Sequence, residues 1–173
     1  AHDWDVKHQV IKLANLIITQ HKQQKALKVN CLVMPSLIKF EPLKKGFKRK
    51  YILWVGRADA WKRPLEFIEL ARFNPQEKFI MICRPGKVKL NINLPNLRFI
   101  PAVPATKILD YFRQAKILVN TSIAEGFPNT FLQAGIVKTP ILSYRVNPNN
   151  YINRYRCGLI GKKQFKQMLN NPE

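Results

Sequence analysis

Two loops of this sequence carry residue types suited to binding phosphate. The first, Val55-Gly-Arg-Ala-Asp-Ala-Trp-Lys-Arg-Pro64, leaves a strand-like segment and enters a helical one. Gly56 allows close backbone approach to a ligand, and Arg57 and Lys62 place cations beside a helix N-terminus that itself favours anions. Pro64 suits the first helical position, where its missing N–H has no helical partner anyway. We expect a diphosphate clamp; the alternative is a basic loop on a basic protein.

The second loop is Asn120-Thr-Ser-Ile-Ala-Glu-Gly-Phe-Pro-Asn-Thr-Phe-Leu-Gln133, again between a strand and a helix. Glu125 stands where a carboxylate could bind a sugar hydroxyl or an ammonium group. Pro128 is predicted at the first helical position, which leaves the N–H groups of Asn129 and Thr130 for phosphate oxygens. The alternative is that Glu125 only caps this helix.

The rest of the residue inventory excludes several kinds of site. Only ten Asp and Glu face 30 Lys and Arg, and Glu66, Glu69 and Asp110 fall in amphipathic helical patterns, where a solvated face is expected. Few acids remain for a hydrolytic carboxylate pair or a Mg²⁺ cage. The histidines lack metal-ligand spacing; they are His2, His8 and His21.

Glycine spacing argues against the common nucleotide-binding loops. No two of the seven glycines are separated by a single residue, so G-x-G-x-x-G is absent, as is the P-loop. Gly158-Leu-Ile-Gly161 matches the bare GXXG of a KH domain. Its inner residues are apolar, however, which favours a turn into a short strand.

Both loops belong to a regular alternation of segments that begins at Tyr51. Strand-like runs occur at 51–55, 79–83, 97–100, 116–120 and 140–144, with helical patterns at 64–73, 104–114 and 128–137. Short apolar strands separated by such helices predict βαβ units and a doubly wound, Rossmann-like parallel α/β sheet. Ligands of such sheets bind outside the carboxyl ends of the strands, where both loops lie.

The first 50 residues are organised differently. A helix is predicted over 6–16, followed by apolar pieces at 16–19 and 31–34. Residues 36–50 read as a basic linker that ends in Lys44-Lys-Gly-Phe-Lys-Arg-Lys50. We therefore expect an N-terminal segment over 1–35, a linker over 36–50 and one main domain over 51–173.

Composition fits a folded protein with a strongly basic surface. Of the 173 residues, 46% are apolar, and the net charge is +20, a field that attracts nucleic acid, acidic lipid or phosphorylated substrates. No apolar run approaches a membrane span and no secretion signal is evident, so we expect a soluble or peripheral protein. Cys31, Cys83 and Cys157 are typical of reduced, buried thiols in the cytoplasm.

The charge leaves a second class of function open. A basic α/β module could bind nucleic acid through cations and interleaved aromatic rings. Such residues are found at 44–50 and later at Arg145, Tyr151, Arg154, Tyr155 and Arg156. No RNP1-like strand, zinc motif or helix-turn-helix signature accompanies them, so nucleic acid is the less favoured partner.

In their order and spacing, the motifs resemble those of group 1 retaining glycosyltransferases similar to family 4. The resemblance is to the C-terminal, donor-binding half of their GT-B fold, and it extends over about 14–170. Its most specific part is the segment around Glu125. The matching pieces are Trp54-Val-Gly-Arg57 with Lys62, Thr121-Ser-Ile-Ala-Glu-Gly-Phe-Pro-Asn129, Ala134-Gly-Ile-Val-Lys-Thr-Pro-Ile-Leu142, Val146-Asn-Pro-Asn-Asn-Tyr151 and Cys157-Gly-Leu-Ile160.

The resemblance implies transfer of a sugar, with retention and without a metal or other cofactor, from a UDP- or GDP-linked donor. Arg57 and Lys62 would stabilise the leaving diphosphate, and Glu125 would match the first Glu of the family's Glu-x7-Glu motif, beside the transferred sugar. The other residues implied to hold the donor are Gly56, Gly126, Phe127, Pro128, Asn129 and Thr130.

Three positions depart from the family pattern. The second Glu of the motif, which would bind the ribose hydroxyls, is Gln133, and an amide makes neutral, weaker hydrogen bonds. The usual Phe-Leu-Gly-x-Val turn reads Phe99-Ile-Pro-Ala-Val103, and Arg84 stands where a Gly often follows the preceding strand. Arg84 and Val103 are therefore expected to line a reshaped base pocket.

The resemblance also implies a larger enzyme. The family carries its acceptor site on an N-terminal Rossmann-like domain, so we expect 1–35 to be the tail of that domain and 51–173 a donor domain truncated at its end. The chain alone would then bind donor without transferring it. The acceptor would be a glycan or a lipid-linked sugar, and the protein cytoplasmic, with 44–50 facing an anionic membrane. Gln133 keeps open a non-catalytic relative that binds nucleotide only.

Overall fold

The computed structural model describes residues 15–19, 31–34, 47–91 and 93–170, in two compact units over 1–37 and 38–173. In the first unit, β1 (Ile17–Thr19) and β2 (Cys31–Val33) pair in parallel, at the two apolar pieces of the N-terminal segment. The helix predicted over 6–16, the three histidines and most of the linker lie outside the described residues.

The second unit is built on one parallel six-stranded sheet. Its strands are β3 (Tyr51–Arg57), β4 (Phe79–Arg84), β5 (Leu97–Ile100), β6 (Ala115–Asn120), β7 (Ile141–Ser143) and β8 (Gly158–Ile160). Their order across the sheet is β5-β4-β3-β6-β7-β8. The chain therefore runs outward from β3 to β5 and returns to start again at β6, so the direction of winding reverses between β3 and β6.

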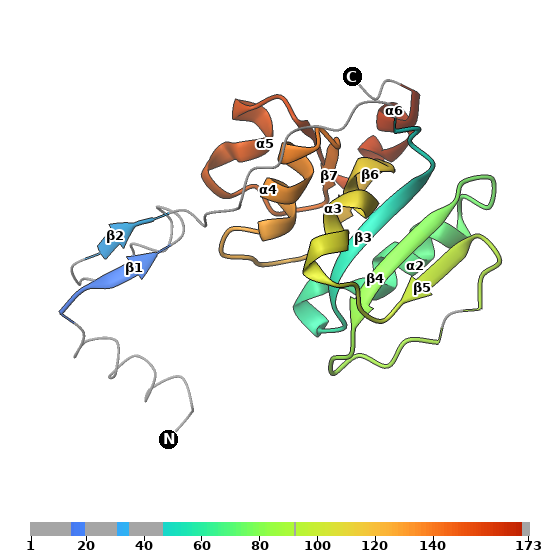
Figure 1. The fold of residues 1–173 in the computed structure, drawn as a ribbon, viewed down its shortest axis with the longest axis horizontal. Coiled ribbons are helices and arrows are strands. Elements are labelled where there is room, and N and C mark those ends of the chain that lie inside the picture. Colours follow the sequence, from blue (N-terminus) through green and yellow to red (C-terminus); the bar gives the residue numbers. More distant parts are fainter. Residues whose placement is uncertain (1–14, 20–30, 35–46, 92, 171–173) are drawn as a thin grey trace. The chain divides into compact units, whose positions relative to one another are not determined.

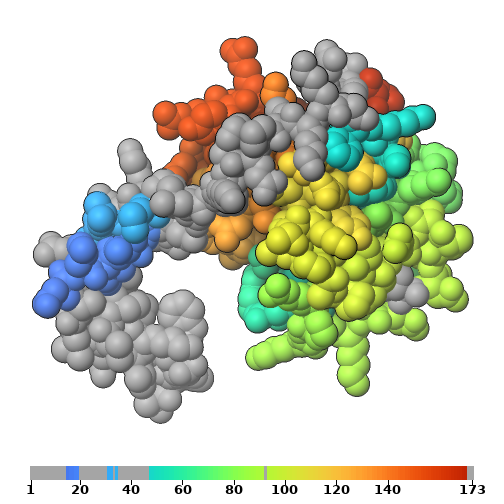
Figure 2. Space-filling model, in the orientation of Figure 1, coloured from blue at the N-terminus to red at the C-terminus, as the bar shows by residue number. Residues whose placement is uncertain are grey.

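Helices cover both faces of this sheet. They are α2 (Pro64–Arg72), α3 (Ala105–Arg113), α4 (Asn129–Ile136), α5 (Tyr151–Arg154) and α6 (Phe165–Asn170). Figure 1 shows α3 in front of the strands and α2 behind them. In the space-filling view of Figure 2, the side chains of α3, in yellow, lie over the middle of the unit on the near face.

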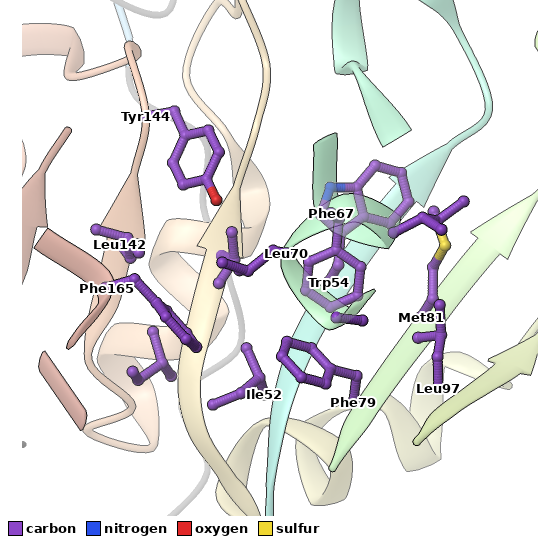
Figure 3. Close-up of a cluster of buried hydrophobic side chains, with 14 of the residues drawn as sticks. Ile52, Trp54, Phe67, Leu70, Phe79, Met81, Leu97, Leu142, Tyr144 and Phe165 are labelled. Carbon is purple, nitrogen blue, oxygen red and sulfur yellow. The ribbon is translucent and has the colours of Figure 1, made fainter. Parts of the chain in front are cut away.

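Alternation along β3 divides the core into two clusters, as a strand buried on both faces requires. Ile52 and Trp54 pack with Phe67 of α2 and Phe165 of α6, and Figure 3 shows this cluster. Leu53, pointing the other way, packs in the second cluster with side chains of α3, α4 and α5. The buried side chains of both clusters hold the strand ends at fixed positions under the loops that follow them.

The predicted doubly wound parallel sheet is confirmed, with each predicted strand and helix of the main domain found within two residues of its expected bounds. The expected short strand after the turn at Gly158 is β8. Two short helices, α5 and α6, were not predicted, because four and six residues are too few to display a helical period. No helix in the described part of the chain is long and apolar enough to cross a membrane.

Two details of the sequence prediction are wrong. Pro64 occupies the first position of α2 as expected, but Pro128 lies one residue earlier, as the N-cap of α4 with ψ at 117°. A proline ring fixes φ and leaves ψ free, so the residue type alone did not distinguish the two positions. Of the three free cysteines only Cys83, within the central strand β4, is buried; Cys31 and Cys157 are partly exposed.

Close packing of β7 against β8 generates a prediction. A Cβ on Gly158 would lie 1.8 Å from the carbonyl oxygen of Ile141, so Gly158→Ala requires the backbone of one strand to move. We expect it to lower the free energy of unfolding by about 1–3 kcal/mol, measured by urea denaturation.

Gly135→Ala is the matched control, because its new methyl group would meet only the Tyr151 hydroxyl at 2.9 Å. That atom ends a side chain, and alanine is favoured within a helix. Equal losses of stability in both variants would contradict the proposed contact between Gly158 and Ile141.

Candidate functional site

A cleft of about 500 Å³ opens at the carboxyl ends of the central strands, a size common for small-molecule sites. Its walls come from the ends of β3 and β4, the loops after β3, β5 and β6, and the first turns of α3 and α4. The reversal of winding lies between β3 and β6, so their two loops separate here and leave a crevice between them.

An ion pair between the two loops lines the cleft. The Nζ of Lys62 donates a hydrogen bond to Oε1 of Glu125 at 2.5 Å, and the hydroxyl of Ser122 donates to the same oxygen at 2.7 Å. The side chains of Lys62 and Glu125 are 24% and 12% exposed. Partial burial reduces the screening of this pair by water. The attraction therefore holds the lysine ammonium and the carboxylate in contact.

The Thr121 hydroxyl joins the same two loops below that pair. It accepts a hydrogen bond from the indole Nε1 of Trp54 at 3.0 Å and donates one to the carbonyl of Lys62 at 2.6 Å. A second tie runs from the N–H of Ile123 to the carbonyl of Trp61 at 2.8 Å. Thr121 is fully buried, so these bonds form in a low-dielectric setting where a lost partner is costly.

Arg57 is oriented by a buried carboxylate. Its Nε donates to Oδ2 of Asp59 at 2.5 Å, and its guanidinium lies over the ring of Trp61, 5.8 Å from the centroid. Asp59 is 3% exposed, whereas the Arg57 side chain is 57% exposed. Because the ion pair uses Nε, both terminal nitrogens of the guanidinium are left for the cleft.

The loop after β4 packs closely against Asp59. A Cβ on Gly86 would lie 2.3 Å from the carbonyl oxygen of Ala58, so glycine is needed at this approach. Burial, together with the nearby Asp59 carboxylate, raises the pKa of the Cys83 thiol to about 11. The thiol therefore stays protonated near neutral pH and is a poor nucleophile.

Glu66 of α2 was predicted to lie on a solvated helix face, but it is bound by Arg145, which in turn contacts the second loop. Its side chain is 18% exposed and accepts from Nη2 of Arg145 at 2.9 Å. Nη1 of the same Arg145 donates to the carbonyl of Thr121 at 3.1 Å. Arg145 reaches α2 from beyond β7, a tertiary contact that helical periodicity does not reveal.

The N-terminus of α4 faces the cleft with Asn129 and Thr130. The N–H of Phe131 bonds the carbonyl of Pro128 at 2.9 Å, whereas the first-turn N–H groups before it have no partner inside the helix. No side chain caps this end, so the capping role considered for Glu125 is not what the structure shows. The helix end supplies donors and a positive dipole.

Three apolar side chains of the lining form an apolar wall of the cleft. Ile82 of β4, Val103 and Ile108 of α3 belong to one hydrophobic cluster. Arg84 and Gln133 contribute polar side chains from β4 and α4. An apolar wall next to donors of this kind suits a flat ring with polar edges.

Positive charge predominates in the cleft. Its lining includes three cations, Arg57, Lys62 and Arg84, and one carboxylate, Glu125. In the part of the chain that the structure describes, no group of three or more His, Cys, Asp or Glu side chains is arranged to hold a metal ion. The excess of cations in the lining and the N-terminus of α4 favour an anionic ligand.

Of the twelve residues that the sequence singled out, all but Gly126 line this one cleft. Gly126 lies in the same loop but does not contribute to the lining. The positioning residues Asp59, Thr121, Ser122 and Arg145 were missed. A carboxylate two residues after Arg57 was the one available signal for Asp59. Thr121 and Arg145 depend on contacts between distant segments, and the bond from Ser122 to Glu125 lies within one irregular loop.

The sequence matches one protein family over most of its length. Residues 37–171, most of the chain, match the family described as glycosyl transferases group 1. The chain belongs to the group 1 glycosyltransferases. No curated protein sequence matches it closely enough to add to this assignment.

Solved structures similar to this glycosyltransferase domain share its fold. TarM has a TM-score of 0.76 at 20% identity, over 96% of this chain and 37% of that one. Sucrose-phosphate synthase from Thermosynechococcus elongatus gives 0.77 at 15%, over 96% and 52%. The C-terminal domain of the group 1 protein LpcC from Francisella tularensis gives 0.57 at 17%, over 73% and 78%.

These likenesses place the Rossmann-like sheet among GT-B glycosyltransferases. The chain spans little more than a third of TarM and about half of the synthase.

The two buried hydrogen bonds of the Thr121 hydroxyl lead to a prediction for this glycosyltransferase domain. Thr121→Val keeps the shape but leaves the Trp54 indole N–H and the Lys62 carbonyl without their partner. We expect the free energy of unfolding to fall by about 1–3 kcal/mol for each buried group left unpaired, measured by urea denaturation.

Thr121→Ser retains the hydroxyl and controls for the lost methyl group, so it should lose clearly less stability. If the valine variant were as stable as the serine variant, the hydroxyl would not be what joins the two loops.

Proposed function

We propose that this domain binds a nucleoside-diphosphate sugar and belongs to a longer enzyme that transfers the sugar, with retention, to a glycan or lipid-linked acceptor. The observation that carries the proposal is the Lys62–Glu125 pair, which lies in a cationic cleft at the point of reversed winding. Membership of the group 1 glycosyltransferases supports the reaction class. Similarity to the retaining enzymes of family 4 is the source of the proposed stereochemistry.

The leaving diphosphate would be held by Arg57, Lys62 and the N-terminus of α4. Charge accumulates on its bridging oxygen as the sugar departs, and fixed cations and N–H groups stabilise that charge without reorganising. We propose that these protein groups, rather than a metal ion, supply this stabilisation. Lys62 is now bound to Glu125 at 2.5 Å, so a bound diphosphate would share this lysine with the carboxylate.

Glu125 would face the transferred sugar. Its Oε1 is already bound by Lys62 and Ser122, which fixes the direction of the carboxylate before a ligand arrives. Ionised carboxylates accept strong hydrogen bonds from hydroxyl groups, so Glu125 can orient the sugar ring. Gly56 would let the ring approach the backbone of β3, where a Cβ would meet the Trp54 ring at 2.7 Å.

The nucleoside would lie against the apolar wall of the cleft. Gln133 would bind the ribose hydroxyls, and Arg84 and Val103 would border the base; all three line the cleft. Two structural neighbours were solved with UDP-type ligands, GtfA with UDP and GlcNAc and a trehalose-6-phosphate protein with UDP-2-fluoro glucose. These ligands support UDP as the first nucleotide to test, with GDP as the alternative.

A basic nucleic-acid module is less well supported. One of its expected cations, Arg145, is bound to Glu66 and to the Thr121 carbonyl, so its charge is used inside the fold.

Contact of the basic stretch 44–50 with an anionic membrane, in a cytoplasmic protein, remains compatible with the donor-binding proposal. Because the acceptor domain of larger relatives is proposed to be needed, the isolated chain is expected to bind donor without transferring it.

Removal of the clamp cations tests the proposal directly. Arg57→Ala and Lys62→Ala should each weaken the binding of UDP or GDP by about 1–3 kcal/mol, the range of a charge-assisted hydrogen bond, measured by titration calorimetry. Arg72→Ala removes an exposed cation that does not line the cleft and should leave affinity unchanged. Undiminished affinity in both clamp variants, or tighter binding of RNA than of any nucleotide, would refute it.

Gln133 allows a second, more local test. Gln133→Glu places a carboxylate at the proposed ribose position, and ionised acceptors bind hydroxyl groups about twice as strongly as neutral ones. We expect UDP to bind several-fold more tightly, while 2′,3′-dideoxy-UDP shows no such gain. An equal change for both ligands would mean that position 133 does not contact the ribose.

A further inference from the structure

A second cleft, of about 1190 Å³, lies at the opposite end of the sheet. Thr139 and Pro140 before β7, Gly158 at the start of β8, and Arg49 before β3 line it. These are the amino ends of parallel strands, whereas the donor cleft is formed at their carboxyl ends. The second cleft therefore lies outside the proposed donor site.

Three cations line this cleft: Arg49, Lys138 and Arg156. Its described lining contains no Asp or Glu, and none of the three forms an ion pair with a carboxylate of the described residues. In the donor cleft, by contrast, Lys62 and Arg57 each have a carboxylate partner. Positive charge at the second cleft is therefore uncompensated within the described part of the chain.

Arg49 shows this most clearly. Its guanidinium donates to the carbonyls of Ala115 and Lys138 at 2.8 and 2.5 Å and to the hydroxyl of Thr139 at 3.2 Å, all neutral oxygens. The side chain is half-buried, and burial lowers its pKa from the ordinary value. A half-buried cation held only by neutral groups is stabilised by an anion at its free N–H groups.

The partial negative charges at nearby helix C-termini balance part of the positive charge of these three cations, but not all of it. Lys138 and Arg156 follow the last residues of α4 and α5, and Arg49 bonds close to the end of α3. Each helix C-terminus is equivalent to at most about half a negative charge, and the four-residue α5 to less. Three full positive charges therefore exceed what these three ends can balance, and the excess favours an anion.

The remaining lining combines apolar and aromatic groups with the polar side chains of Asn153 and Gln167. Leu159 and the rings of Tyr151 and Tyr155 are its partly exposed apolar and aromatic members, and Ile152 and Met168 lie buried beneath them. Tyr155 is 60% exposed, and Arg154 lies over its ring at 5.7 Å. A ligand that fits both halves of this lining carries a phosphate and an apolar group on one molecule.

We propose that this second cleft binds an organic phosphate, with the phosphate held by Arg49, Lys138 and Arg156 and the apolar part packed on Leu159 and the rings of Tyr151 and Tyr155. The ligand is either a lipid headgroup or a free phosphate ester. This site is independent of the proposed donor site. It gives part of the chain's positive charge a specific use.

The test removes charge without straining the backbone. Lys138 and Arg156 both have positive φ, 54° and 48°, a conformation that asparagine tolerates better than most residues. The double variant Lys138→Asn, Arg156→Asn therefore removes two cations while favouring the local fold. The matched control, Arg72→Gln with Lys78→Gln, removes two exposed cations that line neither cleft. Unfolding curves of both variants identify any loss that is merely structural.

Binding of octyl phosphate and inorganic phosphate is measured by calorimetry, and binding of phosphatidylglycerol vesicles by co-sedimentation. We expect octyl phosphate to bind more tightly than inorganic phosphate, and the double variant to lose at least about fivefold in affinity where the control loses little. Binding should persist in the Arg57→Ala, Lys62→Ala double variant, in which the donor cleft is disabled.

The probes also identify the source of the ligand. Selective loss of vesicle binding alone would support a lipid headgroup, and selective loss of octyl phosphate binding a free phosphate ester. Equal losses in the double variant and the control would attribute binding to net charge and overturn the proposal. Absence of binding to every probe, or loss of binding in the donor-cleft variant, would overturn it as well.

Discussion

The hydroxyl of Thr121 is the contact on which the cleft at the carboxyl ends of the strands depends. It accepts from Trp54, whose ring is buried in the core cluster under β3, and donates to the carbonyl of Lys62. The loop that follows β6 is thereby fixed to both the core and the loop that follows β3. Two segments that leave opposite sides of the winding reversal would otherwise diverge. This tie sets the spacing at which Lys62 and Glu125 meet.

Three of the few carboxylates of the chain form ion pairs with cations in the cleft or in the loop beside it. The chain has ten acidic residues against 30 Lys and Arg, yet three acids lie around this one site, each in an ion pair: Asp59 with Arg57, Glu125 with Lys62, and Glu66 with Arg145. A long cationic side chain loses substantial rotamer freedom when it binds a ligand. Pairing with a carboxylate restricts that freedom beforehand, so the proposed diphosphate would meet cations already oriented.

Sequence patterns identified the loops but not their supports. Strand and helix periods predicted the sheet, and loop composition brought eleven of the twelve chosen residues to one cleft, because strand ends converge in any parallel sheet. Ser122 was missed because its bond to Glu125, three residues further on, depends on the path of an irregular loop. Arg145 was missed because its guanidinium bonds the Thr121 carbonyl, 24 residues earlier in the sequence. Glu66 was misjudged for the same reason: a partner from beyond β7 covers it, and no local pattern contains that partner.

The two ends of the sheet differ in how they attract anions. At the carboxyl ends, helices begin, so first-turn N–H groups and the helix dipole add to Arg57 and Lys62. At the amino ends, helices finish with carbonyl groups that repel anions, and attraction there rests on side chains alone. At that end the total positive charge of the side chains therefore has to exceed the partial negative charge of the helix C-termini before a phosphate can bind. Arg49, Lys138 and Arg156 meet this requirement because no described carboxylate pairs with them.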